Sequence, residues 1–147
     1  MPIIKKLGQH KLLLDTHVWI WLMNEDLTLS SNFLKAVDRC QNHEGISISV
    51  ISIWEIGMLA EKKRIELEMD SLNWVERSLA LSGMVLVPIS PRIAIQSTRL
   101  PGVVHGDPAD RIMIATAIEE NAVLVTHDQK ILDYGIDKFL SVYDPKG

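Results

Sequence analysis

Short runs of consecutive apolar residues, separated by stretches with helical signals, constrain the fold of this chain most strongly. Leu12-Leu13-Leu14 and Val123-Leu124-Val125 contain no polar residue, so a strand made of either run would bury both of its faces. Such strands belong to parallel sheets covered by helices on both sides, because the crossover between parallel strands is usually a helix. The sequence therefore predicts an α/β fold.

The predicted elements follow the order β-α-α-β-α-α-β-α-α-β-α-β. Apolar and β-branched runs predict the strands, while capping residues, prolines and glycines mark the helix ends. Strands separated by helices in this way form a parallel sheet with right-handed crossovers. The predicted strands are Lys11–Asp15, Ile46–Ile51, Met84–Val87, Ala122–Thr126 and Phe139–Tyr143; the predicted helices are His17–Met23, one capped by Ser30 or Ser31 that ends near Cys40, Ser52–Lys63, one capped by Asp70 that ends at Leu81, one starting at Ser90-Pro91, one starting at Asp107-Pro108 that ends near Glu120, and Gln129–Tyr134.

The chain of 147 residues is expected to form one domain, because no linker, repeat or low-complexity tract divides it. We assign residues 11–147 to this domain and residues 1–10 to a short N-terminal arm. Cys40 is the only cysteine, so the fold cannot depend on an internal disulfide. No apolar stretch has the length of a membrane span, and Met1–Gly8 lacks the apolar core of a signal peptide. We therefore expect a cytoplasmic protein that does not enter a membrane.

The net charge argues against a broad basic surface for nucleic acid. The chain has 15 Lys and Arg against 19 Asp and Glu, which gives a formal charge of −4. This objection weakens if four carboxylates are held by metal, because the remaining charges then balance. The basic residues that could cluster, or else form ordinary solvated helix faces, are Lys62-Lys63-Arg64, Arg92, Arg99 and Arg111.

Four carboxylates stand beside the apolar segments. Asp15 ends the first predicted strand and Asp128 follows the fourth. Glu55 comes shortly after the second strand, and Asp110 opens an apolar helix that begins at Pro108. Because the carboxyl ends of parallel strands lie along one edge of the sheet, where ligands bind, we expect these side chains to converge.

Helix capping is the competing interpretation of three of these acids. Ser52 and Glu55 have the spacing of a capping box, in which each side chain bonds the backbone of the other residue. Asp107 and Asp110 resemble a second box, and Asp128 can cap the helix that follows it. Caps and metal ligands are compatible, because the first turn after a strand lies at the carboxyl edge of the sheet.

Asp15 is different, because it ends a fully apolar strand where burial is expected. A buried, unpaired carboxylate costs several kcal/mol, more than capping returns. A metal ion, a hydrogen-bond network or a basic partner must offset this cost. The surrounding donors are oxygens, without the Cys pairs or His spacing of zinc sites, so Mg²⁺ or Mn²⁺ is favoured. The histidines that flank the acids are His17, His105 and His127, which are either exposed loop residues or contacts for a phosphate.

A carboxylate-held metal ion supports phosphodiester hydrolysis. The ion acidifies a water molecule and neutralises charge on the phosphate oxygens. The sequence contains no glycine-rich phosphate loop, nucleophile elbow or dinucleotide fingerprint that would indicate another chemistry. Thr16, Thr126 and Arg111 are candidates for positioning the substrate.

Two neighbouring tryptophans carry a further expectation. Trp19 and Trp21 are two positions apart on the first predicted helix, so they cannot share one face of it. We expect one of them to pack in the core and the other to reach a partner surface.

Four segments of the chain resemble, in order and spacing, the motifs of PIN-domain (PilT N-terminus) proteins and, more narrowly, of VapC-type toxins of type II toxin–antitoxin pairs. The resemblance runs from about Lys11 to Asp144, and although each motif is weak alone, four in this order are specific. The segments are Leu13–Trp19, Ile48–Ile56, His105–Ala117 and Leu124–Asp128.

The resemblance implies a three-layer sandwich with a five-stranded parallel sheet in the order 3-2-1-4-5. It also implies a ribonuclease that depends on Mg²⁺ or Mn²⁺. The catalytic metal ligands carried over from the family are Asp15, Glu55, Asp110 and Asp128, of which the last lies where family members vary most, and Asp107 is a secondary ligand or a cap.

The resemblance further implies an RNA substrate, a homodimer and a cognate antitoxin that places a basic side chain near the acids. An arm such as Met1–His10 departs from the family, whose domains often begin at the first strand. The RNA target, the number of metal ions and the identity of the antitoxin are not given by the sequence.

Three other functions stay open at this point. A related phosphoesterase would act on DNA or on a small phosphate ester. A catalytically weak module would bind RNA or antitoxin without turnover, although the presence of all four acids speaks against it. A receiver-like signalling domain would need an aspartate at the end of the third strand, where this chain has Val87-Pro88-Ile89.

Overall fold

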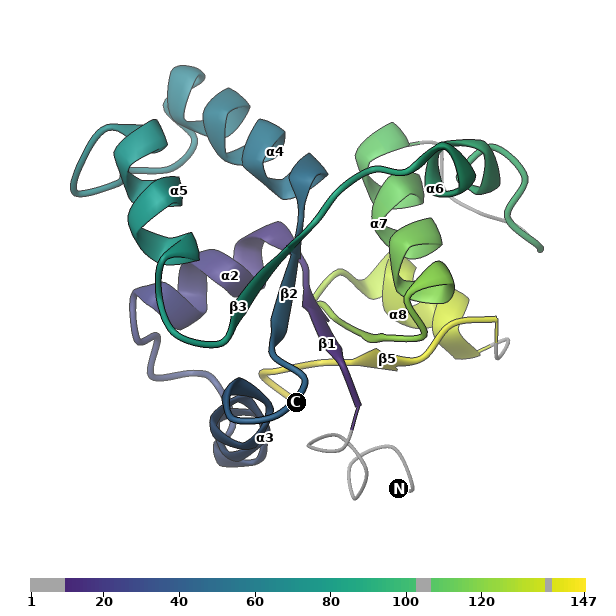
Figure 1. Ribbon diagram of the computed structural model, residues 1–147, viewed down its shortest axis with the longest axis horizontal. Helices are drawn as coiled ribbons and strands as arrows, with labels where there is room; N and C mark the ends of the chain where they lie inside the picture. Colours follow the sequence, from purple (N-terminus) through teal and green to yellow (C-terminus); the bar gives the residue numbers. More distant parts are fainter. Residues whose placement is uncertain (1–9, 103–106, 137–138) are drawn as a thin grey trace.

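The computed structural model describes residues 10–102, 107–136 and 139–147 of the chain. Within them, a five-stranded parallel sheet has the order β3-β2-β1-β4-β5, as expected (Figure 1). The predicted arm and His105 fall largely or wholly outside the described residues. The strands are β1 (Leu12–Leu14), β2 (Ile46–Ser49), β3 (Met84–Val87), β4 (Val123–Val125) and β5 (Val142–Tyr143).

Helices cover both faces of the sheet, which confirms the expected sandwich. Figure 1 shows α2, α4 and α5 on one side of the strands and α6, α7 and α8 on the other. Within the described residues, no helix is both long and apolar enough to cross a membrane. The helices are α2 (Thr16–Met23), α3 (Ser31–Gln41), α4 (Val50–Glu61), α5 (Ser71–Leu79), α6 (Pro91–Gln96), α7 (Pro108–Glu119) and α8 (Gln129–Ile136).

The central strand β1 explains why its sequence is wholly apolar. Leu12 and Leu14 pack into one core cluster, formed with α2, α3, α4 and α5. Leu13 points to the other face and packs with α7 and α8. Since β1 has a neighbouring strand on each side and a helical layer on each face, none of its residues reaches solvent.

Trp19 is the tryptophan that packs in the core. Its side chain is fully buried, its indole N–H donates to Ser78 Oγ at 2.6 Å, and its ring centroid lies 4.9 Å from that of Trp74. Trp21, on a different face of α2, is only half-buried. The expected division between the two tryptophans is confirmed as far as burial is concerned.

One predicted helix start is wrong. β2 ends at Ser49 rather than Ile51, and α4 begins at Val50 because the Ser49 hydroxyl accepts a hydrogen bond from the Ile51 N–H at 3.1 Å. Ser52 therefore lies inside the helix, fully buried, and does not form a capping box with Glu55. Either serine can cap by residue type, so the sequence does not decide between them.

Parallel pairing aligns the ends of β1 and β4. Leu14 pairs with Val125, and the Asp15 N–H donates to the Val125 carbonyl at 2.9 Å. Asp15 and Thr126 thereby leave the sheet at the same edge. This register is what brings together side chains that are more than a hundred residues apart in the sequence.

Candidate functional site

Asp15 stands at the junction of β1 and α2 and caps the helix. One carboxylate oxygen accepts from the Thr16 N–H at 2.8 Å, and the other accepts from the Thr126 hydroxyl at 2.7 Å. Burial raises the pKa of Asp15, while the Thr126 and Thr16 hydrogen bonds and the nearby His17 lower it. Burial is the larger effect, so the structure leaves this carboxylate short of compensation for its charge.

Thr16 links Asp15 to the next acid of the site. Its hydroxyl donates to Glu55 Oε1 at 2.7 Å and lies 2.9 Å from Ser52 Oγ, with which it shares a second hydrogen bond. Thr16 and Ser52 are both buried, so this contact fixes α4 against the start of α2. Burial raises the pKa of Glu55, the Thr16 hydrogen bond lowers it, and the charges of Asp15 and Asp107 raise it further.

Asp107 and Asp110 come from the first turn of α7. Asp107 is the N-cap, and its Oδ1 accepts from the N–H groups of Ala109 at 2.9 Å and Asp110 at 3.4 Å. The capping prediction for Asp107 is therefore confirmed. Asp110 is half-buried, one turn further along the same helix.

Asp110 shows most clearly that the acids share one site. Its pKa is raised from 3.8 to about 7, first by burial and then by repulsion from other carboxylates. The repelling groups come from four different segments of the chain, and in order of effect they are Asp107, Asp15, Asp128 and Glu55. We call these five carboxylates, Asp15, Glu55, Asp107, Asp110 and Asp128, the acidic centre.

Asp128 joins the acidic centre from the loop after β4. Its N–H donates to the Thr126 hydroxyl at 3.1 Å, and its Oδ1 accepts from the N–H groups of Lys130 at 2.8 Å and Ile131 at 3.4 Å. The prediction that it caps α8 is confirmed. The same carboxylate also repels Asp15 and Asp110, so Asp128 both caps α8 and adds negative charge to the acidic centre.

Of the three residues expected to position a substrate, Thr16 and Thr126 bond to acids of the site, whereas Arg111 lies on α7. The hydroxyls of Thr16 and Thr126 are bonded to Glu55 and Asp15, so they orient carboxylates. Arg111 follows Asp110 on α7 and is half-buried. The sequence analysis missed Ser52 as a member of the site, because its spacing to Glu55 looked like a cap.

The acidic centre fits a divalent cation by charge and by donor chemistry. All of its ligand atoms are carboxylate oxygens, which hard cations prefer, and their mutual repulsion is what an ion would relieve. Among the described residues, no three acidic, histidine or cysteine side chains already stand as closely as they would around an ion. Binding therefore requires the side chains to turn inward against their repulsion, which the charge of the ion makes favourable.

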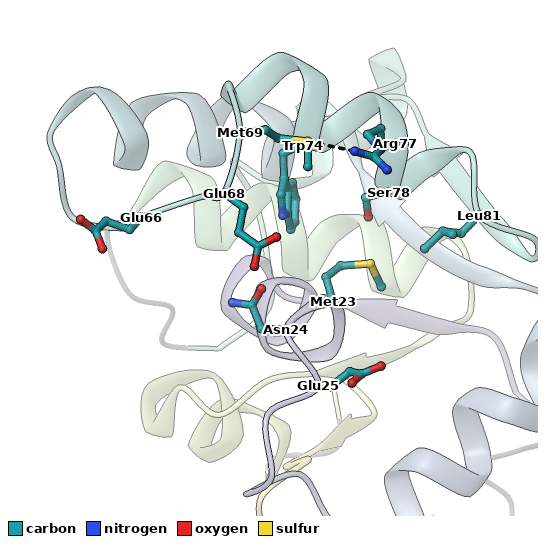
Figure 2. A pocket seen from close by; sticks show the side chains of 10 residues that line it. All are labelled: Met23, Asn24, Glu25, Glu66, Glu68, Met69, Trp74, Arg77, Ser78 and Leu81. Carbon is teal, nitrogen blue, oxygen red and sulfur yellow. Dashed lines mark hydrogen bonds between the residues drawn. The ribbon is translucent and has the colours of Figure 1, made fainter.

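A separate pocket lies away from the acidic centre, at the end of α2 and beside α5 (Figure 2). It has a volume of about 590 Å³ and contains none of the five carboxylates. Apolar side chains and a rim with three glutamates line it: Met23, Asn24, Glu25, Glu66, Glu68, Met69, Trp74, Arg77, Ser78 and Leu81.

Comparison with known proteins gives consistent matches over most of the chain. The family model described as PIN domain matches residues 12–136. Ribonuclease VapC22 of Mycobacterium tuberculosis is 35% identical over 119 residues, which are 81% of this chain and 88% of that protein.

Solved structures agree in fold. VapBC2 from Rickettsia felis, bound to a DNA fragment of its promoter, superposes with a TM-score of 0.65 and 20% identity, covering 90% of this chain and 96% of that one. A toxin–antitoxin complex from Klebsiella pneumoniae has a TM-score of 0.59 and 24% identity, covering 92% and 98%.

We predict that Asp110→Asn stabilises the ion-free protein increasingly as the pH rises. Because the pKa of Asp110 is about 7 in the folded chain and near 3.8 when unfolded, the folded state holds a proton that the unfolded state releases. Asp110 therefore lowers the free energy of unfolding progressively between pH 4 and 7, and asparagine removes that loss. Urea unfolding in EDTA at pH 4.5, 6 and 8 measures it; a difference between variant and wild type that does not change with pH would contradict the prediction.

Thr16→Val should lower the free energy of unfolding by about 1–3 kcal/mol, because it removes two buried hydrogen bonds at nearly constant volume. The matched control is Thr98→Val, since Thr98 is exposed and its hydroxyl donates to the Ile95 carbonyl at the end of α6. The control should stay within about 0.5 kcal/mol of the wild type. Equal effects of the two substitutions in urea unfolding would argue against a structural role for the Thr16 contact.

Proposed function

This chain belongs to the PIN-domain family, in its VapC-type branch, and on that basis we propose that it is a metal-dependent endoribonuclease, the toxin of a toxin–antitoxin pair. The observation that carries the proposal is the acidic centre, in which burial and then repulsion from carboxylates of four segments raise the pKa of Asp110 to about 7. The relative of 35% identity is named as a ribonuclease, which favours RNA over other phosphodiesters.

The proposed metal ligands are Asp15, Glu55 and Asp110, with Asp128 and Asp107 adding charge from their capping positions. The oxygen-only donor set favours Mg²⁺ or Mn²⁺. When bound, such an ion lowers the pKa of a water molecule and offsets the charge of the phosphate.

The side chains around these ligands orient them. Thr126 and the backbone of Thr16 hold the two oxygens of Asp15, so its carboxylate plane is fixed at the end of β1. The Thr16 hydroxyl donates to Oε1 of Glu55, so the second oxygen of this carboxylate would be the one to ligate an ion. Contacts of this kind preserve ligand geometry and contribute to metal affinity.

Asp110 couples ion binding to proton release. With a pKa of about 7, it is protonated in roughly half of the molecules at neutral pH when no ion is present. Since a carboxylate must be ionised to ligate, Asp110 would release this proton when it holds an ion. Apparent metal affinity should therefore increase with pH through neutrality.

The proposed protein partner is an antitoxin, because complexes of toxins with antitoxins are among the structures that share this fold. The pocket at the end of α2 suits a segment of the partner with apolar and basic side chains. Its floor includes Met23 and Trp74, and its rim carries Glu25, Glu66 and Glu68 (Figure 2). A homodimer, expected from the family, belongs to the same proposal and is tested by the mass in solution.

A phosphoesterase that acts on DNA is the alternative with the same chemistry. It would use the same acidic centre, so the substrate itself separates the two proposals. Matched single-stranded oligonucleotides with and without ribose 2′-hydroxyls are the test: cleavage of the deoxy form at the same rate would favour the alternative.

Asp15→Asn should reduce Mg²⁺- or Mn²⁺-dependent cleavage of RNA by about a hundredfold or more, since it removes a charged ligand at nearly unchanged shape. The matched control is Asp133→Asn, because Asp133 is exposed on α8 and bonds Gln129. The control should cleave like the wild type, and EDTA should stop both. Wild-type rates from a folded Asp15→Asn protein would refute the metal assignment.

Glu66→Lys with Glu68→Lys should weaken binding of the cognate antitoxin, to be sought as the product of a short reading frame beside this gene, by roughly tenfold. RNA cleavage by the toxin alone should not change, because neither residue belongs to the acidic centre. Asp38→Lys with Glu44→Lys, at two exposed positions on α3 and in the loop after it, is the control, because it changes the net charge by the same amount as the pocket variant. Calorimetry on the purified pair measures the affinities; equal losses for the pocket variant and the control would remove the pocket from the proposal.

A further inference from the structure

A cluster of rings beside the acidic centre has no part in the chemistry described so far. His17 and His127 both pack against the indole of Trp21, with ring centroids 6.2 and 5.7 Å from it. Lys146 Nζ lies 3.7 Å from the centroid of the same ring. These side chains come from α2, from the loop after β4 and from the C-terminal segment, so the contact joins three distant parts of the chain. We call His17, Trp21 and His127 the histidine rim.

The ring of His127 is held in one orientation. Its Nδ1 lies 2.9 Å from Asp144 Oδ1, which also accepts from the Lys146 N–H at 3.0 Å. The edge-on contact with Trp21, at an interplanar angle of 70°, restrains the ring from a second direction. Because Asp144 engages Nδ1, the nitrogen that remains to meet a ligand is Nε2.

The C-terminal segment supports this arrangement. Lys146 Nζ lies 3.8 Å from Asp26 Oδ2, and the Ser30 N–H donates to the Pro145 carbonyl at 2.7 Å. Residues 144–146 are thereby fastened to α2 and to the loop that follows it. Asp144 can therefore act as a fixed support for the imidazole of His127.

The histidine rim adjoins the acidic centre directly. His17 is two residues from Asp15 and lowers its pKa through its charge. His127 stands between Thr126, which donates to Asp15, and Asp128. His17 is exposed and the side chain of His127 is half exposed, so both can meet a molecule that approaches the acids.

An RNA strand that binds at the acidic centre needs hydrogen-bond donors for the phosphates beside the scissile one. The chain has a formal charge of −4, and the acidic centre repels phosphates on either side of the one that is cut. Imidazolium rings, which carry an N–H on both nitrogens, can donate to the oxygens of a neighbouring phosphate at the edge of the centre; for His127, Nδ1 then donates to Asp144 and Nε2 to the phosphate. Because these rings are already packed on an indole, they lose little conformational entropy when they bind a phosphate.

We propose that His17 and His127 contact the phosphate next to the scissile one in the RNA strand, and that Trp21, Asp144 and Lys146 position them. The inference rests on the proposed function, because it names how RNA is held at that same site. It assigns substrate contact to side chains that ligate no metal ion in this account. The competing explanation is that the cluster only fastens the C-terminal segment to α2.

The first experiment compares His17→Ala, His127→Ala and the double variant in steady-state cleavage of a fluorescein-labelled single-stranded RNA of mixed sequence. The double variant should raise KM about tenfold and change kcat less than about threefold, because the contacts are to substrate away from the reacting atoms. His43→Ala is the matched control, since His43 is exposed in the turn just after α3 and bonds the Arg39 carbonyl. His127→Gln, which keeps an N–H donor near Nε2, should retain more affinity than His127→Ala.

The second experiment uses the wild-type protein in EDTA, where RNA stays intact, and so does not depend on the folding of any variant. Side-chain NMR signals of His17 and His127 should shift when the labelled RNA is added, and those of His43 should not. Unshifted rim signals, or a double variant with wild-type KM, would overturn the inference while leaving the ribonuclease proposal in place. A wild-type protein that neither cleaves nor binds RNA would instead overturn the proposed function, and the inference with it.

Discussion

Repulsion between carboxylates at one edge of a parallel sheet is the constraint on which the rest of this structure depends. The register of β1 and β4 places Asp15 and Thr126 together. The second turn of α4 adds Glu55, and the starts of α7 and α8 add Asp107, Asp110 and Asp128. The hydroxyls of Thr16 and Thr126 satisfy part of the charges of Glu55 and Asp15, yet the pKa of Asp110 remains raised to about 7. We propose that a divalent ion offsets this cost when it binds.

Features set by local sequence were predictable, and features set by side-chain packing were not. The wholly apolar β1 and the alternation of strands and helices predicted the parallel α/β architecture, while the family resemblance supplied the strand order. Caps at Asp107 and Asp128 followed from residue type and position. The hydroxyl of Ser52 was misassigned because two serines three positions apart both suit a cap, and only the burial of Ser52 against Thr16 separates them.

The site divides its tasks among neighbouring groups of side chains. Carboxylates supply negative charge, and threonine hydroxyls orient two of these carboxylates. The histidine side chains that pack on the Trp21 indole lie beside the acidic centre. The histidine rim could not be found from the sequence, because its support by Asp144 and Lys146 depends on where the C-terminal segment lies. Sequence position indicates that His17 and His127 are neighbours of the acids, and the tertiary contacts place both rings beside Trp21 and hold that of His127 in one orientation.

The most direct test of the account is a crystal structure of the protein soaked in Mn²⁺, with anomalous diffraction used to locate the ion. The account predicts a peak at the acidic centre, within about 2.0–2.5 Å of carboxylate oxygens of at least two of Asp15, Glu55 and Asp110. Those side chains should be turned inward relative to the ion-free protein. An acidic centre without an anomalous peak at saturating Mn²⁺, or with these three carboxylates facing separate regions, would contradict it.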